Sequence, residues 1–233
     1  DLVSRIDYRP AAATRLQFLA DSLSESQQQM AWQLAHRQRT LDDSTFTALP
    51  VPQQASILRV AYQHLRFEQE KAVRDPAQAQ HSLELLKALH KLNAGEAPTP
   101  PPPAQPDSGH DTLLAGISGG RSNGTGLLDL RLRTSYHDLA DNPVGYLDGA
   151  AINLGELQLR QREDDSLQIE LLNFVEISSH APQNRFFTPI TWRVRAGFDR
   201  VYSETDDALT ARVNGGAGIT RELGDRHLVY GMG

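Results

Sequence analysis

The chain has 233 residues, which permits one large domain or two small ones. It contains no cysteine, which excludes a thiol nucleophile, a thiolate metal site and a disulfide. The net charge of −6 is uneven, with 11 basic and 10 acidic side chains in residues 1–95 but 12 basic and 19 acidic ones in residues 96–233. An acidic second half argues against nucleic acid as a partner, and no apolar run reaches the roughly 18 residues of a transmembrane helix.

Residues 1–95 read as helical, because apolar residues recur there at intervals of three and four. They predict a small helical bundle or a pair of helical hairpins. A long helix is expected from about residue 53 to residue 73. The expected signals of helix starts and ends are a capping box at Ser24 and Gln27, a cap with proline at Asp75-Pro76, and a C-terminal glycine at Gly95.

A Pro-rich linker follows at residues 96–108. Its polyproline run, residues 100–103, cannot lie inside a helix or a central strand and acts as a stiff spacer of about 3 Å per residue. We therefore predict three parts: a helical connector at 1–95, the linker at 96–108, and a β region at 109–233.

The β region alternates apolar and polar residues, as in Leu128 to Arg133 and in Ile190 to Asp199. The alternation slips between Leu154 and Leu157, which indicates a bulge. Six or seven strands are expected in an antiparallel meander, so the fold class is α+β: a small helical bundle, then a partial β-barrel or a sheet. Because the last residues, 231–233, read as the start of a strand, we expect the β region to be truncated.

Strands of this length with one apolar and one charged face suit two structures. One is a transmembrane barrel with a polar lumen, which needs at least about eight strands, so that this chain would hold only part of one. The other is a half-buried soluble sheet. Periodicity does not choose between them.

The sequence offers no convincing catalytic motif. The glycine-rich segment 119–126 lacks the lysine of a phosphate-binding loop and reads as a hairpin turn. Two His-Asp dyads, His110-Asp111 and His137-Asp138, could be combined with Asp141, Asp148 and His180 into a metal site, but capping of turns explains them more simply. The histidines of the helical part, which are expected to be solvated or satisfied locally, are His36, His64, His81 and His90.

We therefore expect no catalytic residue, no metal ligand and no cofactor in this chain. An arginine beside paired aromatics, in residues 184–189, could bind a ligand, although a loop that packs its rings on the sheet edge is the simpler interpretation. The candidate binding residues are His110, His137, Asp138, Arg185, Trp192 and Arg193.

Several segments resemble a known family when taken together. They are residues 7–16 (DYRPAAATRL), 109–111 (GHD), 136–141 (YHDLAD), 145–150 (GYLDGA), and 184–187 (NRFF) with Pro189 and 192–194 (WRV). They resemble the region downstream of the catalytic-type domain in the Lnb N-terminal periplasmic domain family of Gram-negative envelope proteins. The resemblance covers nearly the whole chain. It rests on short sequence segments that are typical of the family rather than on a catalytic motif.

The resemblance implies a helical connector and a β-rich, outer-membrane region that follow a cysteine-hydrolase or acyltransferase-like domain. The cysteine motif of that family would lie before Asp1, so no catalytic residue carries over to this chain. The leading hypothesis is a non-catalytic module of the cell envelope, in the periplasm or outer membrane. Its expected partners are the upstream domain and outer-membrane lipid or lipoprotein.

Two other hypotheses stay open. In the first, the β region is a soluble periplasmic binding module whose Arg-rich sheet face holds an anionic glycan or a lipid headgroup. In the second, which is weaker, the His-Asp dyads make the chain a self-contained hydrolase.

Overall fold

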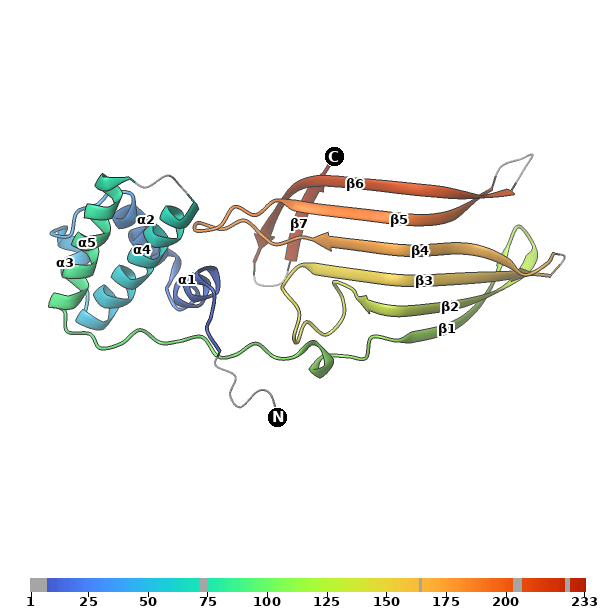
Figure 1. Ribbon diagram of the computed structural model, residues 1–233, viewed down its shortest axis with the longest axis horizontal. Coiled ribbons are helices and arrows are strands. Elements are labelled where there is room, and N and C mark those ends of the chain that lie inside the picture. The colour runs from blue at the N-terminus through green and yellow to red at the C-terminus, as the bar shows by residue number, and fades with distance from the viewer. Residues whose placement is uncertain (1–7, 72–74, 164, 203–206, 225–226) are drawn as a thin grey trace, which may run out of the picture. The chain divides into compact units, whose positions relative to one another are not determined.

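The chain folds into two compact units, Asp1–Pro102 and Pro103–Gly233 (Figure 1). The computed structural model describes residues 8–71, 75–163, 165–202, 207–224 and 227–233. Helices form the first unit and an antiparallel sheet forms the second, which confirms the predicted α+β class.

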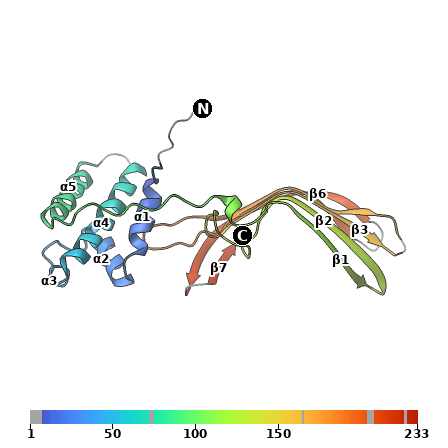
Figure 2. The ribbon, with the colours of Figure 1, turned by 90° about the horizontal axis from the view of Figure 1, so that it is seen from below.

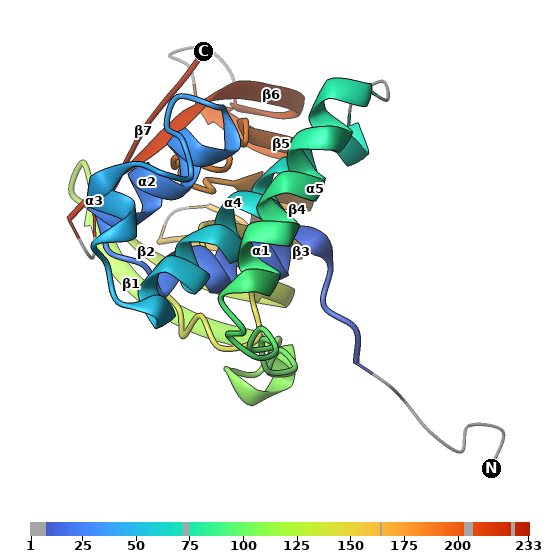
Figure 3. The ribbon, with the colours of Figure 1, turned by 90° about the vertical axis from the view of Figure 1, so that its left-hand side faces the viewer.

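The helical unit is arranged around one long helix. Its helices are α1 (Ala12–Asp21), α2 (Glu25–Ala35), α3 (Ser44–Thr47), α4 (Val51–Lys71) and α5 (Pro76–Lys91). Figure 3 looks onto this unit, in which α1, α2 and α5 each pack against α4. The largest fully buried side chains of its core are Leu16, Leu34, Ile57, Leu58, Val60 and Leu85. None of the described helices is both long and apolar enough to cross a membrane.

Most of the predicted helix signals are confirmed. The Ser24 side chain accepts a hydrogen bond from the Gln27 amide, and the Gln27 side chain bonds back to the Ser24 amide. Asp75 caps α5, with proline at its first turn. The expected cap at Gly95 is wrong: α5 ends at Lys91, because Asn93 already adopts a left-handed conformation with φ of 50°.

Two further differences concern the middle of the helical unit. The long helix begins at Val51, two residues earlier than expected, and its predicted end at residue 73 lies outside the described residues. The short helix α3 was not predicted. It forms because the Asp43 carboxylate accepts hydrogen bonds from the Thr45 and Phe46 amides.

The linker contains neither helix nor strand between residues 94 and 105, and ends in a short 3₁₀ turn, η1 (Pro106–Ser108). Seven strands follow in the order of the sequence, each paired with the next: β1 (Leu114–Ser122), β2 (Thr125–His137), β3 (Ala150–Arg162), β4 (Gln168–Ser179), β5 (Thr191–Tyr202), β6 (Asp207–Leu223) and β7 (His227–Met232). The predicted meander is confirmed. The sheet is not closed, and β1 and β7 are its edges.

The glycine-rich segment 119–126 is the hairpin that the sequence predicts. Asn123 and Gly124 have φ of 52° and 87° and join β1 to β2 as the two central residues of a tight turn. Positive φ at both positions is typical of a type I′ turn, whose twist matches that of the paired strands.

The sheet is bent along its length, as Figure 2 shows. At the predicted phase slip between Leu154 and Leu157, Gly155 has φ of 72°, and a Cβ atom there would clash with the Thr134 hydroxyl at 2.4 Å. The left-handed glycine therefore causes the slip. Shifts of register occur nearby, between Gln158 and Leu159 along β3 and between residues 173 and 175 along β4.

Burial in the β unit is inverted relative to the helical unit. Among its described residues, Phe186 is the one large apolar side chain that is buried. The other fully shielded side chains are polar or charged, among them Asp129, Arg133, Asn153, Glu156, Asn173, Thr191 and Thr220. Large apolar side chains of β2 and β5 are exposed instead, such as Leu130 at 41%.

The capping box gives a direct test of the helical unit. We expect Ser24→Ala to lower the free energy of unfolding of the helical unit by about 1 kcal/mol, because the Gln27 amide in the first turn of α2 loses its hydrogen-bond partner. Urea unfolding followed by the helical circular dichroism signal measures this change. Ser44→Ala is the control, since Ser44 is exposed and α3 is capped by Asp43 instead. Equal losses in both variants would contradict the assignment.

Candidate functional site

Two faces of the sheet divide its side chains by chemistry. The charged face carries Asp129, Arg131, Arg133, Glu156, Arg160, Glu170, Glu176, Arg193, Arg195, Asp199 and Arg212. The apolar face carries Leu128, Leu130, Leu132, Leu157, Leu159, Leu172, Ile177, Trp192, Val194, Phe198 and Val213. Because neighbours along a strand point to opposite faces, the alternation of apolar and polar residues in the sequence produces this separation.

The arginines of the charged face are paired with carboxylates, most of which lie on neighbouring strands. Arg160 binds Asp129 through two nitrogens, at 2.7 and 2.8 Å, and reaches Glu170 at 2.7 Å. This hydrogen bonding lowers the pKa of Asp129. Further cross-strand pairs join Arg131 to Glu156, Arg193 to Glu176, and Arg212 to Asp199, while Arg195 binds Asp199 within β5. The face is therefore a cross-strand ion-pair network rather than a row of free cations.

Two of the predicted binding residues meet at the end of β2. His137 is the last residue of that strand, and His110 lies in the segment before β1. His110 Nε2 and His137 Nδ1 are 3.0 Å apart, while His110 Nδ1 lies 2.7 Å from the Asp111 carbonyl oxygen. Because a carbonyl only accepts, His110 Nδ1 is the donor there, and His137 Nδ1 donates to His110 Nε2.

Aromatic rings enclose this histidine pair. The Tyr146 ring stacks on His137 with centroids 3.7 Å apart, and Tyr136 lies 5.3 Å from the ring of His110. His137 is buried. Its burial, with the adjacent His110, lowers the pKa of His137 below its ordinary value, while Asp141 and Asp138 act in the opposite direction.

Asp138 pairs with arginine and not with its neighbour in the predicted His-Asp dyad. Arg133, which is 4% exposed, donates from its two terminal nitrogens to the two oxygens of Asp138 at 2.7 and 2.9 Å. The hydrogen bonds from Arg133 hold the pKa of Asp138 below its usual range. The Arg133 guanidinium also lies over the ring of Tyr136, 4.2 Å from its centre. Asp138 is therefore not positioned to orient His137 as a general base.

A shallow pocket of 150 Å³ adjoins this pair on the charged face. Its lining consists of Arg131, Arg133, Asp138, Ala151, Ile152, Asn153, Glu156, Glu176 and Ser178. The Asn153 side chain bonds to both Arg133 and Glu156, so the lining groups largely satisfy one another. Such a pocket suits a small polar ligand better than an apolar one.

The remaining predicted residues lie apart from the histidine pair. Arg193 is on the charged face, bound to Glu176, which lines the pocket. Trp192, its neighbour in β5, lies on the apolar face. Arg185 is exposed in the loop between β4 and β5, which is shaped by the Asn184 side chain accepting from the Phe186 and Phe187 amides. The six residues therefore do not form one site.

Of the other residues considered for a metal site, His180 lies apart from the histidine pair and Asp141 lies beside it. His180 contacts the Ser178 hydroxyl at 3.2 Å and the ring of Tyr230, and burial lowers its pKa. Asp141 lies 3.9 Å from His110 Nε2, so that His110, His137 and Asp141 form a group with the composition of a metal site. The two histidine nitrogens are, however, 3.0 Å apart, which is the length of a hydrogen bond. These nitrogens therefore bond to each other rather than face a shared ion.

Sequence reasoning missed the residues that complete the site. Arg133, Tyr136 and Tyr146 surround the histidine pair, yet in the sequence they belong to an ordinary alternating strand and to a loop. The bidentate pair of Arg133 and Asp138 was only weakly indicated by the sequence. Arg133 lies near the end of β2, and Asp138 is the first residue of the turn that follows it.

Comparison with known families covers both units. Residues 103–233 match a family described as Domain of unknown function (DUF7840), and residues 6–101 match another described as Domain of unknown function (DUF7842). The first match spans more than half of the chain, so the protein belongs to the DUF7840 family. No curated protein and no solved structure gives a significant match. The resemblance to the Lnb N-terminal family stays a prediction.

The buried His137 is expected to make the β unit sensitive to acid. Because the pKa of His137 is lowered in the folded chain, the unfolded chain binds more protons below about pH 6.5, so stability falls as the pH drops through that value. The slope for one group is at most about 1.4 kcal/mol per pH unit. His137→Asn keeps a donor toward His110 but does not titrate, and we expect it to flatten this dependence.

Thermal unfolding midpoints measured between about pH 8 and pH 5 check this expectation. His227→Asn, at an exposed position of β7, is the matched control and should keep the wild-type profile. A wild-type midpoint that does not fall with acid would contradict the role given to His137. His180 is expected to contribute any remaining slope, since burial lowers its pKa as well.

Proposed function

We propose that this chain is a non-catalytic module of the Gram-negative cell envelope. In this proposal the helical unit connects an upstream periplasmic domain, similar to cysteine hydrolases or acyltransferases, to a β region of outer-membrane type. Its partners are that upstream domain and the lipid or lipoprotein of the outer membrane. The support is the resemblance described above together with the inverted burial of the β unit.

The inverted burial is the observation that carries the proposal. Rows of leucine, valine and isoleucine on the apolar face are exposed, while the carboxylates and guanidinium groups of the charged face shield one another. Exposed apolar surface costs about 25 cal/mol per Å² in water and nothing comparable in lipid. The length of the strands, 12 or 13 residues for β2 to β5, exceeds the roughly 9–11 residues that a spanning strand needs.

The proposal requires that the two edges of the sheet be paired in the membrane. Lipid offers no hydrogen-bonding group, so the free backbone groups of β1 and β7 need further strands beside them. The soluble alternative, an Arg-rich face that binds an anionic glycan or lipid headgroup, is weakened by the pairing of its arginines. Each arginine named on the charged face has a carboxylate partner, which leaves little net positive potential there.

Adjacent residues of β6 provide a matched test of the proposal. Val213 is 84% exposed and pairs with Ala196 on the apolar face, whereas Asn214 is exposed on the charged face opposite Arg195. We expect Val213→Arg to weaken partitioning into lipid by about 2–4 kcal/mol if the site lies near the bilayer midplane. Asn214→Arg introduces the same side chain on the other face and should leave partitioning nearly unchanged.

Flotation of the chain with phosphatidylethanolamine and phosphatidylglycerol vesicles measures the partitioning. Wild type and Asn214→Arg should float with the vesicles, and Val213→Arg should remain mostly at the bottom of the gradient. A wild-type chain that stays monomeric and soluble without detergent, and never floats, would contradict the proposal and favour the soluble binding module. If Val213→Arg and Asn214→Arg float to the same extent, the assignment of Val213 to a lipid-facing side of the sheet is contradicted.

A further inference from the structure

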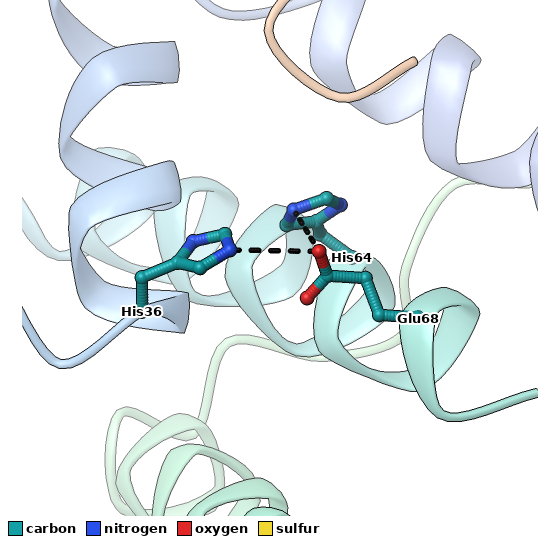
Figure 4. A group of neighbouring side chains, drawn as sticks. All are labelled: His36, His64 and Glu68. Carbon is teal, nitrogen blue, oxygen red and sulfur yellow. Dashed lines mark ion pairs between the residues drawn. The ribbon is translucent and has the colours of Figure 1, made fainter. Parts of the chain in front are cut away.

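The sequence predicts that the histidines of the helical unit are solvated or satisfied locally. Two of them, His36 and His64, meet one carboxylate, that of Glu68, and Figure 4 shows the three side chains converging. Their ligating atoms all lie within 4.8 Å of one another. We propose that these residues form a binding site for a divalent transition-metal ion, zinc foremost.

Two helices bring the three residues together. His64 and Glu68 are one turn apart on α4, so their side chains lie on the same face of that helix. His36 is the residue that caps the C-terminal end of α2, which packs against α4. The site is therefore held by the two elements that share the core of the unit, and its positions do not depend on a loop.

The distances fit a shared ion better than a direct ion pair. His36 Nε2 and His64 Nε2 each lie 3.5 Å from the same oxygen, Glu68 Oε1. A charge-assisted hydrogen bond between such groups would be about 2.7–2.9 Å long. Two ligands of a tetrahedral ion with bonds of about 2.0–2.1 Å lie roughly 3.3–3.4 Å apart. The 3.5 Å separation in the protein is close to the distance between two ligands of one ion.

The orientation of His36 is fixed by its surroundings in the manner of a metal ligand. Its Nδ1 lies 2.9 Å from the Trp32 carbonyl oxygen, and since a carbonyl only accepts, Nδ1 carries the proton. In the neutral imidazole this leaves the lone pair on Nε2, the atom that faces Glu68. The Trp32 ring also stacks on His36, with centroids 4.2 Å apart. Hydrogen bonding of the second ring nitrogen to a carbonyl is typical of histidines that bind metals.

The ligand set indicates the kind of ion and the access to it. Two imidazoles and one carboxylate are a recurrent set for zinc, with one position left for water. Glu68 is 39% exposed and His64 only 4%, so the ion would enter from the Glu68 side and rest on the buried ring. By contrast, the two rings in the group of His110, His137 and Asp141 are joined by a direct hydrogen bond, which occupies the nitrogens that a metal would need.

The test is a zinc titration of the full chain after removal of metals with a chelator. A chromophoric competitor measures the affinity, and Co²⁺ in place of zinc reports four-coordination through its visible absorption. We expect one zinc ion per chain at this site. Glu68→Gln and His36→Asn should each weaken binding by at least about 10- to 100-fold, since even the loss of a supporting hydrogen bond has that effect. His36→Asn retains an N–H donor for the Trp32 carbonyl.

The same unit supplies a matched control. His81 Nδ1 and Glu84 lie at the same separation of 3.5 Å but have no third ligand among the residues that the structure describes, and His81 Nε2 is bonded to the Leu34 carbonyl. Glu84→Gln should therefore keep the wild-type affinity, as should His110→Gln in the β unit. Absence of saturable zinc binding by wild type would overturn the proposal. So would wild-type affinity in both site variants, or an equal loss in Glu84→Gln. The helical circular dichroism of each metal-free variant verifies that it is folded.

Discussion

The β unit depends on the pairing of opposite charges on one face of its sheet. Arg160 with Asp129 and Glu170, and Arg133 with Asp138, place guanidinium groups where they are shielded from water and satisfied by carboxylates. Removing one partner of such a pair leaves the other charge without compensation, which is costly in a shielded position. The charges of the charged face therefore compensate one another within the sheet. The apolar face carries the large apolar side chains that in another domain would form a buried core.

Fold class and strand order could be predicted because they depend on local periodicity and on turn residues. The two-residue alternation, the Asn123-Gly124 turn and the capping box at Ser24 each act over a few neighbouring residues. The end of α5 could not be predicted from Gly95, because Asn93 was also able to adopt the left-handed conformation and came first. Where two nearby residues can both end a helix, the sequence alone does not show which of them will do so.

The grouping of the candidate residues in space could be predicted much less well than the fold. His110, His137 and Asp138 were singled out as dyads of neighbours, whereas the structure pairs His110 with His137 and Asp138 with Arg133. The grouping of His36 with His64 and Glu68 requires knowledge of how α2 packs on α4. Contacts between elements depend on packing angles and on register, neither of which is encoded by a short motif.

The strictly consecutive order of the strands affects how the sheet can be assembled. Each strand finds its partner in the segment made immediately before it, so no pairing has to wait for a distant part of the chain. Loop closure between successive strands is entropically cheap, and topologies with such short separations fold quickly. The sheet can therefore grow by adding one hairpin after another at a single advancing edge, beginning at β1 and proceeding toward β7.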